Sequence, residues 1–408
     1  MRNIEDVYCR RNRKVEHMEQ QNEHIFTPRF LSLFFTNLAI FLVFYGLVTT
    51  LPLYALDTLH RSDDESGLLV TVFLVSAIIA RPFSGKLLDL YGKKRLLVIS
   101  LLFYLICTVA YVFFKDFTLL LALRFFQGIW FSIATTAAGS LAADIVPEKR
   151  KGTGLGYFAM STNLAIVIGP FISLLVIQYF SFNALFIVLA VFVTLGALFA
   201  MTFKQTAPVV KQTTKFRLTF NDLFEKKAVP LAMIAAFIAI AYSSVLSFLS
   251  LYASEKDLLG AASYFYAVLA VAMIGVRPLT GRIYDTYGAK FVIIPSFMLF
   301  AIGLAMIANA NGALLFLCSA IFIGAGYGTL TTSFQSLCVQ ATAPTRTSYA
   351  TATYFTFFDL GIALGSYVLG IIAVSMSYHE VYLLSAILMI VILIVYMIGF
   401  TRKKQTHA

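Results

Sequence analysis

The sequence predicts an all-α integral membrane protein with twelve transmembrane helices arranged as two pseudo-symmetric six-helix bundles. Composition is the first reason: of 408 residues, 60% are hydrophobic and 12% are charged, and the mean hydropathy is +0.84. Soluble domains carry about 25% charged residues, so these values are typical of a chain that folds in lipid. The second reason is an internal repeat, because one pattern occurs at Arg81–Lys94 and again at Arg277–Lys290, 196 residues later.

The repeated pattern reads Arg-Pro-x-x-Gly-x-x-x-Asp-x-Tyr-Gly-x-Lys, and seven of its fourteen positions are identical in the two copies. A second stretch keeps the same offset, since residues 163–170 (NLAIVIGP) align with residues 359–366 (DLGIALGS). Two matches at one offset indicate that the chain is a duplicated unit.

Twelve apolar segments follow in order, each near the roughly 20 residues needed to cross about 30 Å of hydrocarbon. Six fall in each half, so both halves enter the membrane from the same side and are related by an axis along its normal. The segments lie near 30–56, 66–88, 95–114, 117–141, 154–178, 182–203, 229–253, 261–281, 291–309, 313–338, 347–374 and 380–400. We expect tails at 1–29 and 401–408, bundles at 30–203 and 229–400, and a linker at 204–228.

Lysine and arginine gather in the segments on one side of the membrane. By the positive-inside rule, this places both termini in the cytoplasm of a cell-membrane protein. Topology and lipid headgroups then account for the net charge of +11, and no nucleic-acid partner is expected. Outside the linker, the basic groups assigned to this side are Arg2, Arg10, Arg11, Arg13, Lys14, Arg29, Lys93, Lys94, Arg95, Lys149, Arg150, Lys151, Arg402, Lys403 and Lys404, whereas the opposite loops hold Arg61, Lys115 and Lys256.

The polar first 27 residues contain no apolar run, so they are not a cleavable signal, and Met18 is an alternative start. Four cysteines, Cys9, Cys107, Cys318 and Cys338, show no CxxC or His/Cys spacing, so neither a disulfide nor a metal site is indicated. The chain has no GxxxxGK[ST] loop and no large soluble segment. We therefore expect a membrane protein that is not an enzyme, needs no cofactor and works as a monomer.

The repeated pattern resembles the loop motif of the major facilitator superfamily of transporters, and the resemblance extends from about residue 30 to residue 400. Glycine lets two helix ends approach closely, and an aspartate there can accept hydrogen bonds from the neighbouring helix. The resemblance implies a cytoplasmic gate, which Asp144 joins beside Asp89. The alternative is an ordinary solvated turn. The candidate gate residues are Gly85, Asp89, Gly92, Lys93 and Asp144 in the first half and Gly281, Asp285 and Gly288 in the second.

Arg81 and Arg277 open the two copies, one turn inside the same helix ends. Either arginine could stabilise the closed gate, or its side chain could extend to the lipid headgroups. Arg124 lies within Arg124-Phe125-Phe126-Gln127-Gly128, which is similar to a motif of the superfamily whose arginine faces the interior and is linked with proton movement. A buried guanidinium at this depth needs a cavity or a partner, and the other interpretation is again an arginine that reaches the headgroups.

Gly169-Pro170 resembles the core of the superfamily's antiporter motif. The match is partial, because Ala165, Ser173 and Leu174 replace glycines of that motif, and a proline kink explains the pair equally well. Asp359 is the carboxylate expected nearest the bilayer midplane, with neutral Asn163 at the equivalent position of the first half. A carboxylate there can bind a proton from one side and release it to the other, or it can be a protonated donor between helices.

By resemblance, spans 1, 4, 7 and 10 line the substrate cavity. The residues expected there look aromatic and sparsely charged, which favours amphipathic or hydrophobic substrates. The leading hypothesis is therefore proton-coupled efflux of such compounds. The alternatives are a proton-coupled nutrient or metabolite carrier, and a receptor or lipid scramblase on the same fold. The candidate cavity residues are Asn37, Tyr45, Gln127, Trp130, Asn163, Tyr242, Tyr327 and Gln335.

Overall fold

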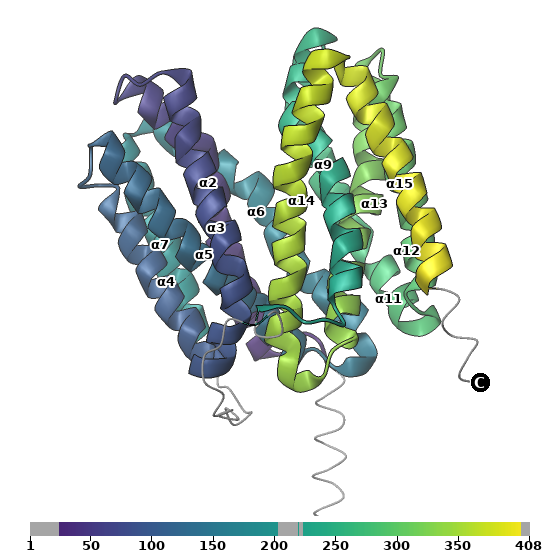
Figure 1. Ribbon diagram of the computed structural model, residues 1–408. Helices are drawn as coiled ribbons and strands as arrows, with labels where there is room; N and C mark the ends of the chain where they lie inside the picture. The colour runs from purple at the N-terminus through teal and green to yellow at the C-terminus, as the bar shows by residue number, and fades with distance from the viewer. Residues whose placement is uncertain (1–23, 203–218, 220–222, 401–408) are drawn as a thin grey trace, which may run out of the picture.

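The computed structural model describes residues 24–202, 219 and 223–400, and these ranges contain helices but no strand (Figure 1). Most of the expected linker, residues 1–23 of the expected N-terminal tail with Cys9 and Met18, and the C-terminal tail 401–408 lie outside the described residues. The long helices of the first half are α2 (Pro28–Asp57), α3 (Asp63–Tyr91), α4 (Lys93–Ala110), α5 (Phe117–Ile145), α6 (Lys151–Tyr179) and α7 (Phe182–Thr202). Those of the second half are α9 (Val229–Glu255), α10 (Leu259–Gly275), α11 (Arg277–Tyr287), α12 (Lys290–Ala308), α13 (Ala313–Gln340), α14 (Thr347–Ser375) and α15 (Tyr378–Phe400).

Eleven of the described helical segments are long and apolar enough to cross a membrane. The expected span at 95–114 corresponds to α4, which has 18 residues and begins with Lys93, Lys94 and Arg95. Because these three charges fall within only 18 residues, α4 is not among the eleven segments. Nevertheless, α4 packs lengthwise against α5 and α7 within the bundle (Figure 1). The architecture is that of an all-α, multi-pass membrane protein.

Most helix boundaries lie within about three residues of the apolar segments, and polar side chains cap the starts of several helices. Thr27 accepts the amide of Phe30 at the start of α2, and Asp116 accepts that of Leu119 at the start of α5. At the start of α3, Ser62 and Glu65 form a reciprocal capping box. Hydropathy therefore located the spans, while polar side chains fix the starts of α2, α3 and α5.

The second copy of the repeated pattern interrupts its helix, and the first copy does not. Pro82 lies inside the continuous α3, whereas Val276 separates α10 from α11 just before Pro278. Proline removes one backbone hydrogen bond in both copies. The second copy also has Gly275 where the first has Ile79, and glycine lowers helix stability further.

Buried apolar side chains form two clusters, one within each half of the chain. The first gathers residues between Ile25 and Ala200 together with Val339, and the second gathers residues between Ala228 and Tyr396. Many large apolar side chains remain exposed on the outside, such as Val374 at 91% and Val271 at 70%. An exposed apolar surface of this kind fits a bilayer rather than water.

The two halves meet at one end of the bundle, which we call the linker end because α7 ends there at Thr202 and α9 begins there at Val229. In Figure 1 the halves lie close together at this end and diverge toward the opposite end. The contacts join α3 and α5 to α14, and α6 to α10, α11 and α13. In the part of the chain that the structure describes, the hydrogen bonds between halves involve residues 81–89, 140–153, 285, 336 and 348–359.

Two glycines shape the turns that carry the repeated pattern at the linker end. Gly92 ends α3 with φ 87°, and Gly288 ends α11 with φ 96°. Their amides donate to the carbonyls of Leu88 and Tyr284, which closes each helix in the same way. Residues with a side chain rarely adopt such positive φ values, so the glycines of the pattern are required by the backbone.

Candidate functional site

An ion pair between Arg81 on α3 and Asp359 on α14 joins the two halves. The Nε atom of Arg81 donates to Oδ2 of Asp359 at 2.6 Å. The side chain of Arg81 is 5% exposed and that of Asp359 is 24% exposed, so the pair is largely shielded from solvent. The contact bridges 278 residues of sequence. It brings together two residues for which the sequence suggested separate roles.

The rest of the Arg81 guanidinium is held by neighbouring side chains of both halves. Its Nη1 donates to the hydroxyl groups of Thr135 at 2.9 Å and Thr136 at 3.4 Å, both on α5. The ring of Phe355 on α14 lies 4.8 Å from the guanidinium carbon, and Phe131 lies 5.9 Å from it. Arg81 therefore points into the protein, which excludes the interpretation that it reaches the lipid headgroups.

Asp359 lies within electrostatic range of three tyrosines, Tyr45, Tyr327 and Tyr354. The rings of Tyr242 on α9 and Tyr327 on α13 stack with centroids 3.7 Å apart and planes 7° apart. Tyr45 on α2 lies within electrostatic range of Asp359 and of both stacked rings. Tyr354 on α14 also interacts with Asp359, and its hydroxyl donates to the carbonyl of Thr331 at 2.8 Å. An acidic group beside aromatic faces and hydroxyls can contact a solute that is partly apolar and partly polar.

Arg277 repeats the position of Arg81 in the second half but has no carboxylate beside it among the described residues. It is 4% exposed, and its Nη1 donates to the hydroxyl of Thr332. Thr136 and Thr332 are 196 residues apart, as Arg81 and Arg277 are, so this contact is duplicated together with the pattern. Burial of Arg277 again excludes an arginine that reaches the headgroups.

Both aspartates of the repeated pattern contact the opposite half. Asp285 accepts the amides of Gly152 at 2.9 Å and Thr153 at 3.0 Å, at the start of α6. Asp89 accepts the hydroxyl of Tyr349 at 3.2 Å, near the start of α14. A carboxylate at a helix N-terminus is stabilised by free amides and by the helix dipole. Both are thus fixed in contacts between the halves rather than in free turns.

Lys93, a basic residue inside the first copy, pairs with an acid other than Asp89. Lys93 Nζ lies 2.6 Å from Oδ2 of Asp144 on α5, and this pair stays within the first half. The resemblance suggested that Asp144 joins Asp89, but the structure gives Asp144 the Lys93 ammonium. Side chains exposed by 16% and 36% make this a surface pair that contributes little to stability.

The pattern glycines permit close packing between the halves. A Cβ atom on Gly85 would lie 3.1 Å from the Cα of Tyr349, and one on Gly281 would lie 2.8 Å from the Cα of Thr153. Residues 153 and 349 are themselves 196 positions apart, so both halves use one contact twice. The neighbouring atoms are backbone and cannot move aside easily. A larger residue at either glycine would push the halves apart.

Arg124 lies inside the first half and not beside Asp359. It is fully buried, its Nε donates to the carbonyl of Leu69 at 2.8 Å, and the ring of Phe73 lies 4.2 Å from its guanidinium carbon. Its Nη1 donates to Oε1 of Gln127 at 3.0 Å, and Tyr111 donates to the same oxygen at 2.7 Å. Burial excludes the headgroup alternative. Gln127, expected in the cavity, belongs to this internal network instead.

The other expected cavity residues are dispersed. Asn37 donates across the first half to Ser161 at 2.8 Å, and Trp130 stacks on Phe103 of α4 at 4.3 Å between centroids, away from the tyrosines. Gln335 lies at the contact between halves, where its amide nitrogen would be 3.6 Å from a Cβ atom on Gly139. Asn163 is 7% exposed, and its amide nitrogen has no hydrogen-bond partner among the described residues. Of the eight residues, Tyr45 and Tyr327 lie within electrostatic range of Asp359, and Tyr242 stacks on Tyr327.

Sequence reasoning missed Tyr354 and the threonines at the arginines. Thr135-Thr136 recurs as Thr331-Thr332 at the offset of the repeat, so a longer comparison of the halves would have found them. Tyr354 carries no such signal, because aromatic residues make up 15% of the chain. Within residues 24–202, 219 and 223–400, no group of three His, Cys, Asp or Glu side chains is placed to hold a metal ion.

Comparison with known proteins gives a family and several relatives. The sequence matches the Major Facilitator Superfamily over residues 33–366 and 278–408. It is 27% identical to the uncharacterized MFS-type transporter MJ1560 of Methanocaldococcus jannaschii over 352 residues, which cover 84% of this chain and 90% of that protein. It is also 31% identical to the quinolone resistance protein NorA of Staphylococcus aureus over 134 residues, which cover 32% of this chain and 34% of NorA.

Two solved structures have the same fold. The human organic anion transporter MFSD10 (TETRAN) superposes with a TM-score of 0.77 at 14% identity, covering 90% of this chain and 98% of that one. The proton:xylose symporter XylE bound to 6-bromo-6-deoxy-D-glucose gives 0.74 at 14% identity, covering 92% and 96%. Identity this low concerns the fold alone.

The membrane-spanning helices, the contacts between two halves and these matches define a multi-pass membrane transporter of small molecules, which is not an enzyme. The chain belongs to the major facilitator superfamily.

Proposed function

We propose that the protein is a proton-coupled secondary transporter that exports small amphipathic or hydrophobic compounds by alternating access. In this proposal it works as a monomer in the cell membrane, with both termini and the linker end facing the cytoplasm. The structure then corresponds to the conformation that is closed toward the cytoplasm. The observation that carries the proposal is the Arg81–Asp359 pair, which joins the halves through a group that can bind a proton.

Proton binding to Asp359 changes the contact between the halves. An ionised Asp359 holds Arg81 across α3 and α14, whereas a protonated Asp359 loses the charge attraction and weakens closure of the linker end. A proton that arrives from outside would therefore favour opening toward the cytoplasm. Release of that proton inside restores the carboxylate, and the pair can form again as the transporter turns outward.

The tyrosines around Asp359 support an amphipathic substrate. Tyr45 and Tyr327, which lie within electrostatic range of Asp359, and Tyr242, which stacks on Tyr327, offer ring faces for apolar groups and hydroxyls for polar ones. A solute that contacts Asp359 competes with the proton, which is the requirement for exchange of the two. The partial similarity to NorA, which its name connects with quinolone resistance, points in the same direction.

The test uses proteoliposomes with an imposed pH gradient and a pH dye inside. Lipophilic cations, neutral drugs, sugars and amino acids are added in turn, and substrate-evoked proton flux is recorded. We expect flux with amphipathic compounds and its loss in Asp359→Asn. Asp257→Asn is the matched control, because Asp257 is exposed in the α9–α10 turn and asparagine tolerates its φ of 57°.

Two outcomes would contradict the proposal. Persistent flux in Asp359→Asn would remove Asp359 from the coupling path. Flux evoked by a sugar or an amino acid, and not by amphipathic compounds, would make the protein a nutrient or metabolite carrier.

A further inference from the structure

Arg277 is a buried cation without a counter-ion among the described residues. It is 4% exposed, its Nη1 donates to Thr332, and its Nε has no hydrogen-bond partner. None of the ion pairs within the described ranges includes it. Arg124 also lacks a carboxylate, and its Nη2 is unpartnered among the described residues, but a carbonyl, an amide oxygen and an aromatic face contact the rest of its guanidinium. Arg277 therefore stands out as the less compensated charge.

Comparison with Arg81 shows what the second site lacks. In each half the arginine Nη1 contacts a threonine hydroxyl. For Arg81 this is Thr136 on α5, and for Arg277 it is Thr332 on α13. The Nε of Arg81 then donates to Asp359, and the residue equivalent to Asp359 at the offset of 196 residues is the neutral Asn163. Asn163 is 7% exposed, and its own amide nitrogen is unpartnered within the described part of the chain. Arg81 thus donates to a carboxylate, whereas Arg277 has no carboxylate to accept its hydrogen bonds within the described residues.

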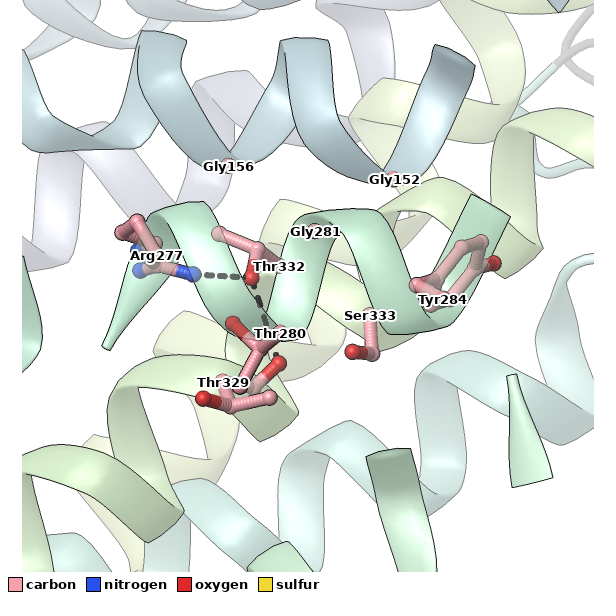
Figure 2. Close-up of a pocket in the computed structure, with 9 residues that line it drawn as sticks. All are labelled: Gly152, Gly156, Arg277, Thr280, Gly281, Tyr284, Thr329, Thr332 and Ser333. Carbon is pink, nitrogen blue, oxygen red and sulfur yellow. Dashed lines mark hydrogen bonds between the residues drawn. The ribbon is translucent and has the colours of Figure 1, made fainter. Parts of the chain in front are cut away.

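A small cavity lies beside Arg277, between α6 of the first half and α11 and α13 of the second (Figure 2). Its lining includes the hydroxyl side chains of Thr280, Thr329, Thr332 and Ser333, and Gly156 leaves room on α6. Thr329 is 1% exposed, and its hydroxyl has no partner among the described residues. The cavity is small and has room for about one water-sized particle.

The charges around the cavity favour an anion. Burial of an uncompensated guanidinium is costly, whereas a charge-assisted hydrogen bond to an anion offsets that cost. The nearby Tyr327 and Tyr354 interact electrostatically with Arg277 but carry hydroxyl groups rather than carboxylates. Asp285 lies two turns along α11, where its oxygens already accept the Gly152 and Thr153 amides.

We propose that Arg277 is the centre of a binding site for a small monovalent anion, such as chloride, between the two halves. The anion accepts from the Arg277 Nε and from neighbouring hydroxyls, and so replaces the carboxylate that Asp359 supplies to Arg81. Because α6 and α11 come from different halves, a bound anion stabilises closure of the linker end. This site does not depend on proton coupling or on the identity of the transported compound.

The test exploits the asymmetry of the repeat. Thermal unfolding of the full-length protein in lipid nanodiscs is followed in sodium gluconate, with chloride replacing gluconate at constant ionic strength. We expect chloride to raise the melting temperature of the wild type and of Asn163→Ala. Asn163→Asp provides a built-in carboxylate, so we expect it to be more stable than Asn163→Ala in gluconate and to lose the response to chloride.

Arg277→Gln should also lose the chloride response and saturable binding of radioactive chloride. If that variant does not fold, the comparison of Asn163→Asp with Asn163→Ala still decides the matter. Equal chloride responses in these two variants, or no response in the wild type, would overturn the proposal. A response to acetate but not to chloride would support the anion site and assign it to a carboxylate group. All these measurements use no gradient and no transport substrate, so their failure is distinct from failure of the proposed function.

Discussion

At the scale of the residue, the two arginines of the repeat share a position and a threonine contact but differ in charge compensation. Arg81 faces Asp359 at 2.6 Å, and Arg277 faces hydroxyls. The same motif therefore gives one site with an acidic partner and another that lacks an internal acid. A difference at one pair of equivalent positions, Asp359 and Asn163, is enough to make the halves unequal.

Removal of one partner of the Arg81–Asp359 pair should destabilise the protein more than removal of both. Arg81→Gln leaves a shielded carboxylate without its cation, which costs roughly 3 kcal/mol. Adding Asp359→Asn to that variant removes the orphaned charge, so the double variant should recover part of the loss. The measurement is denaturant-induced unfolding in mild detergent for the two single variants, the double variant and the wild type. Losses that simply add would show that the two side chains do not interact.

Sequence reasoning found most residues of the site but not their pairings. Asp359, Arg81 and Arg277 stood out because charges are rare within apolar spans, and the repeat marked the gate glycines. The Arg81–Asp359 contact escaped because its partners are 278 residues apart and belong to different patterns. The tyrosines near Asp359 could not be separated from Trp130 and Gln127, because these two also lie on a span expected to line the cavity and carry polar groups.

At the scale of the element, the helices follow hydropathy closely, and glycine decides how near they approach. α11 packs on α6 through Gly281 and Thr153, and α3 packs on α14 through Gly85 and Tyr349. Hydropathy located each span because lipid requires a continuous apolar stretch. It could not reveal the interruption at Val276, which depends on the backbone effects of Gly275 and Pro278 together.

A bulky residue in the α6–α11 contact should prevent closure of the linker end. In Gly281→Leu the new side chain meets the backbone of Thr153, at 2.8 Å from its first carbon, so the halves must separate there. We expect a monodisperse, folded protein whose substrate-evoked proton flux falls at least about tenfold, since a shift of only about 1.4 kcal/mol changes a population by that factor. Gly67→Leu is the matched control, because no atom lies within 4 Å of the equivalent position on Gly67. Equal flux in the two variants would mean that this contact does not limit the cycle.

At the scale of the whole molecule, two helical clusters contact each other near the linker end and diverge from it (Figure 1). Alternating access requires these contacts to break and form again in each cycle. A covalent bond between the halves should therefore arrest transport, while a bond within one half should not.

Ser140 on α5 and Ser348 on α14 offer a place for such a bond, because their hydroxyl oxygens are 3.3 Å apart across the halves. In a background without Cys9, Cys107, Cys318 and Cys338, we expect the Ser140→Cys/Ser348→Cys protein to form a disulfide on oxidation. Transport should stop on oxidation and return with a reductant.

The control for this cross-link lies within the first half. Ser32 and Thr202 have hydroxyl oxygens 3.4 Å apart on α2 and α7, so Ser32→Cys/Thr202→Cys places a similar bond inside one bundle. It should leave transport intact. Unimpaired transport by the oxidised Ser140/Ser348 variant would exclude movement of the halves at this contact.

The N-terminus of α6 is capped by a residue from the other half. Arg150 provides no side-chain cap there, and the Asp285 carboxylate accepts the Gly152 and Thr153 amides instead. Whenever the halves part at the linker end, those two amides lose their acceptor and meet water. The rate of deuterium uptake at these two amides therefore reports how often the halves separate at the linker end. We expect slow uptake in the oxidised Ser140→Cys/Ser348→Cys variant and fast uptake in Gly281→Leu. The wild-type rate then measures how often the molecule opens at this end.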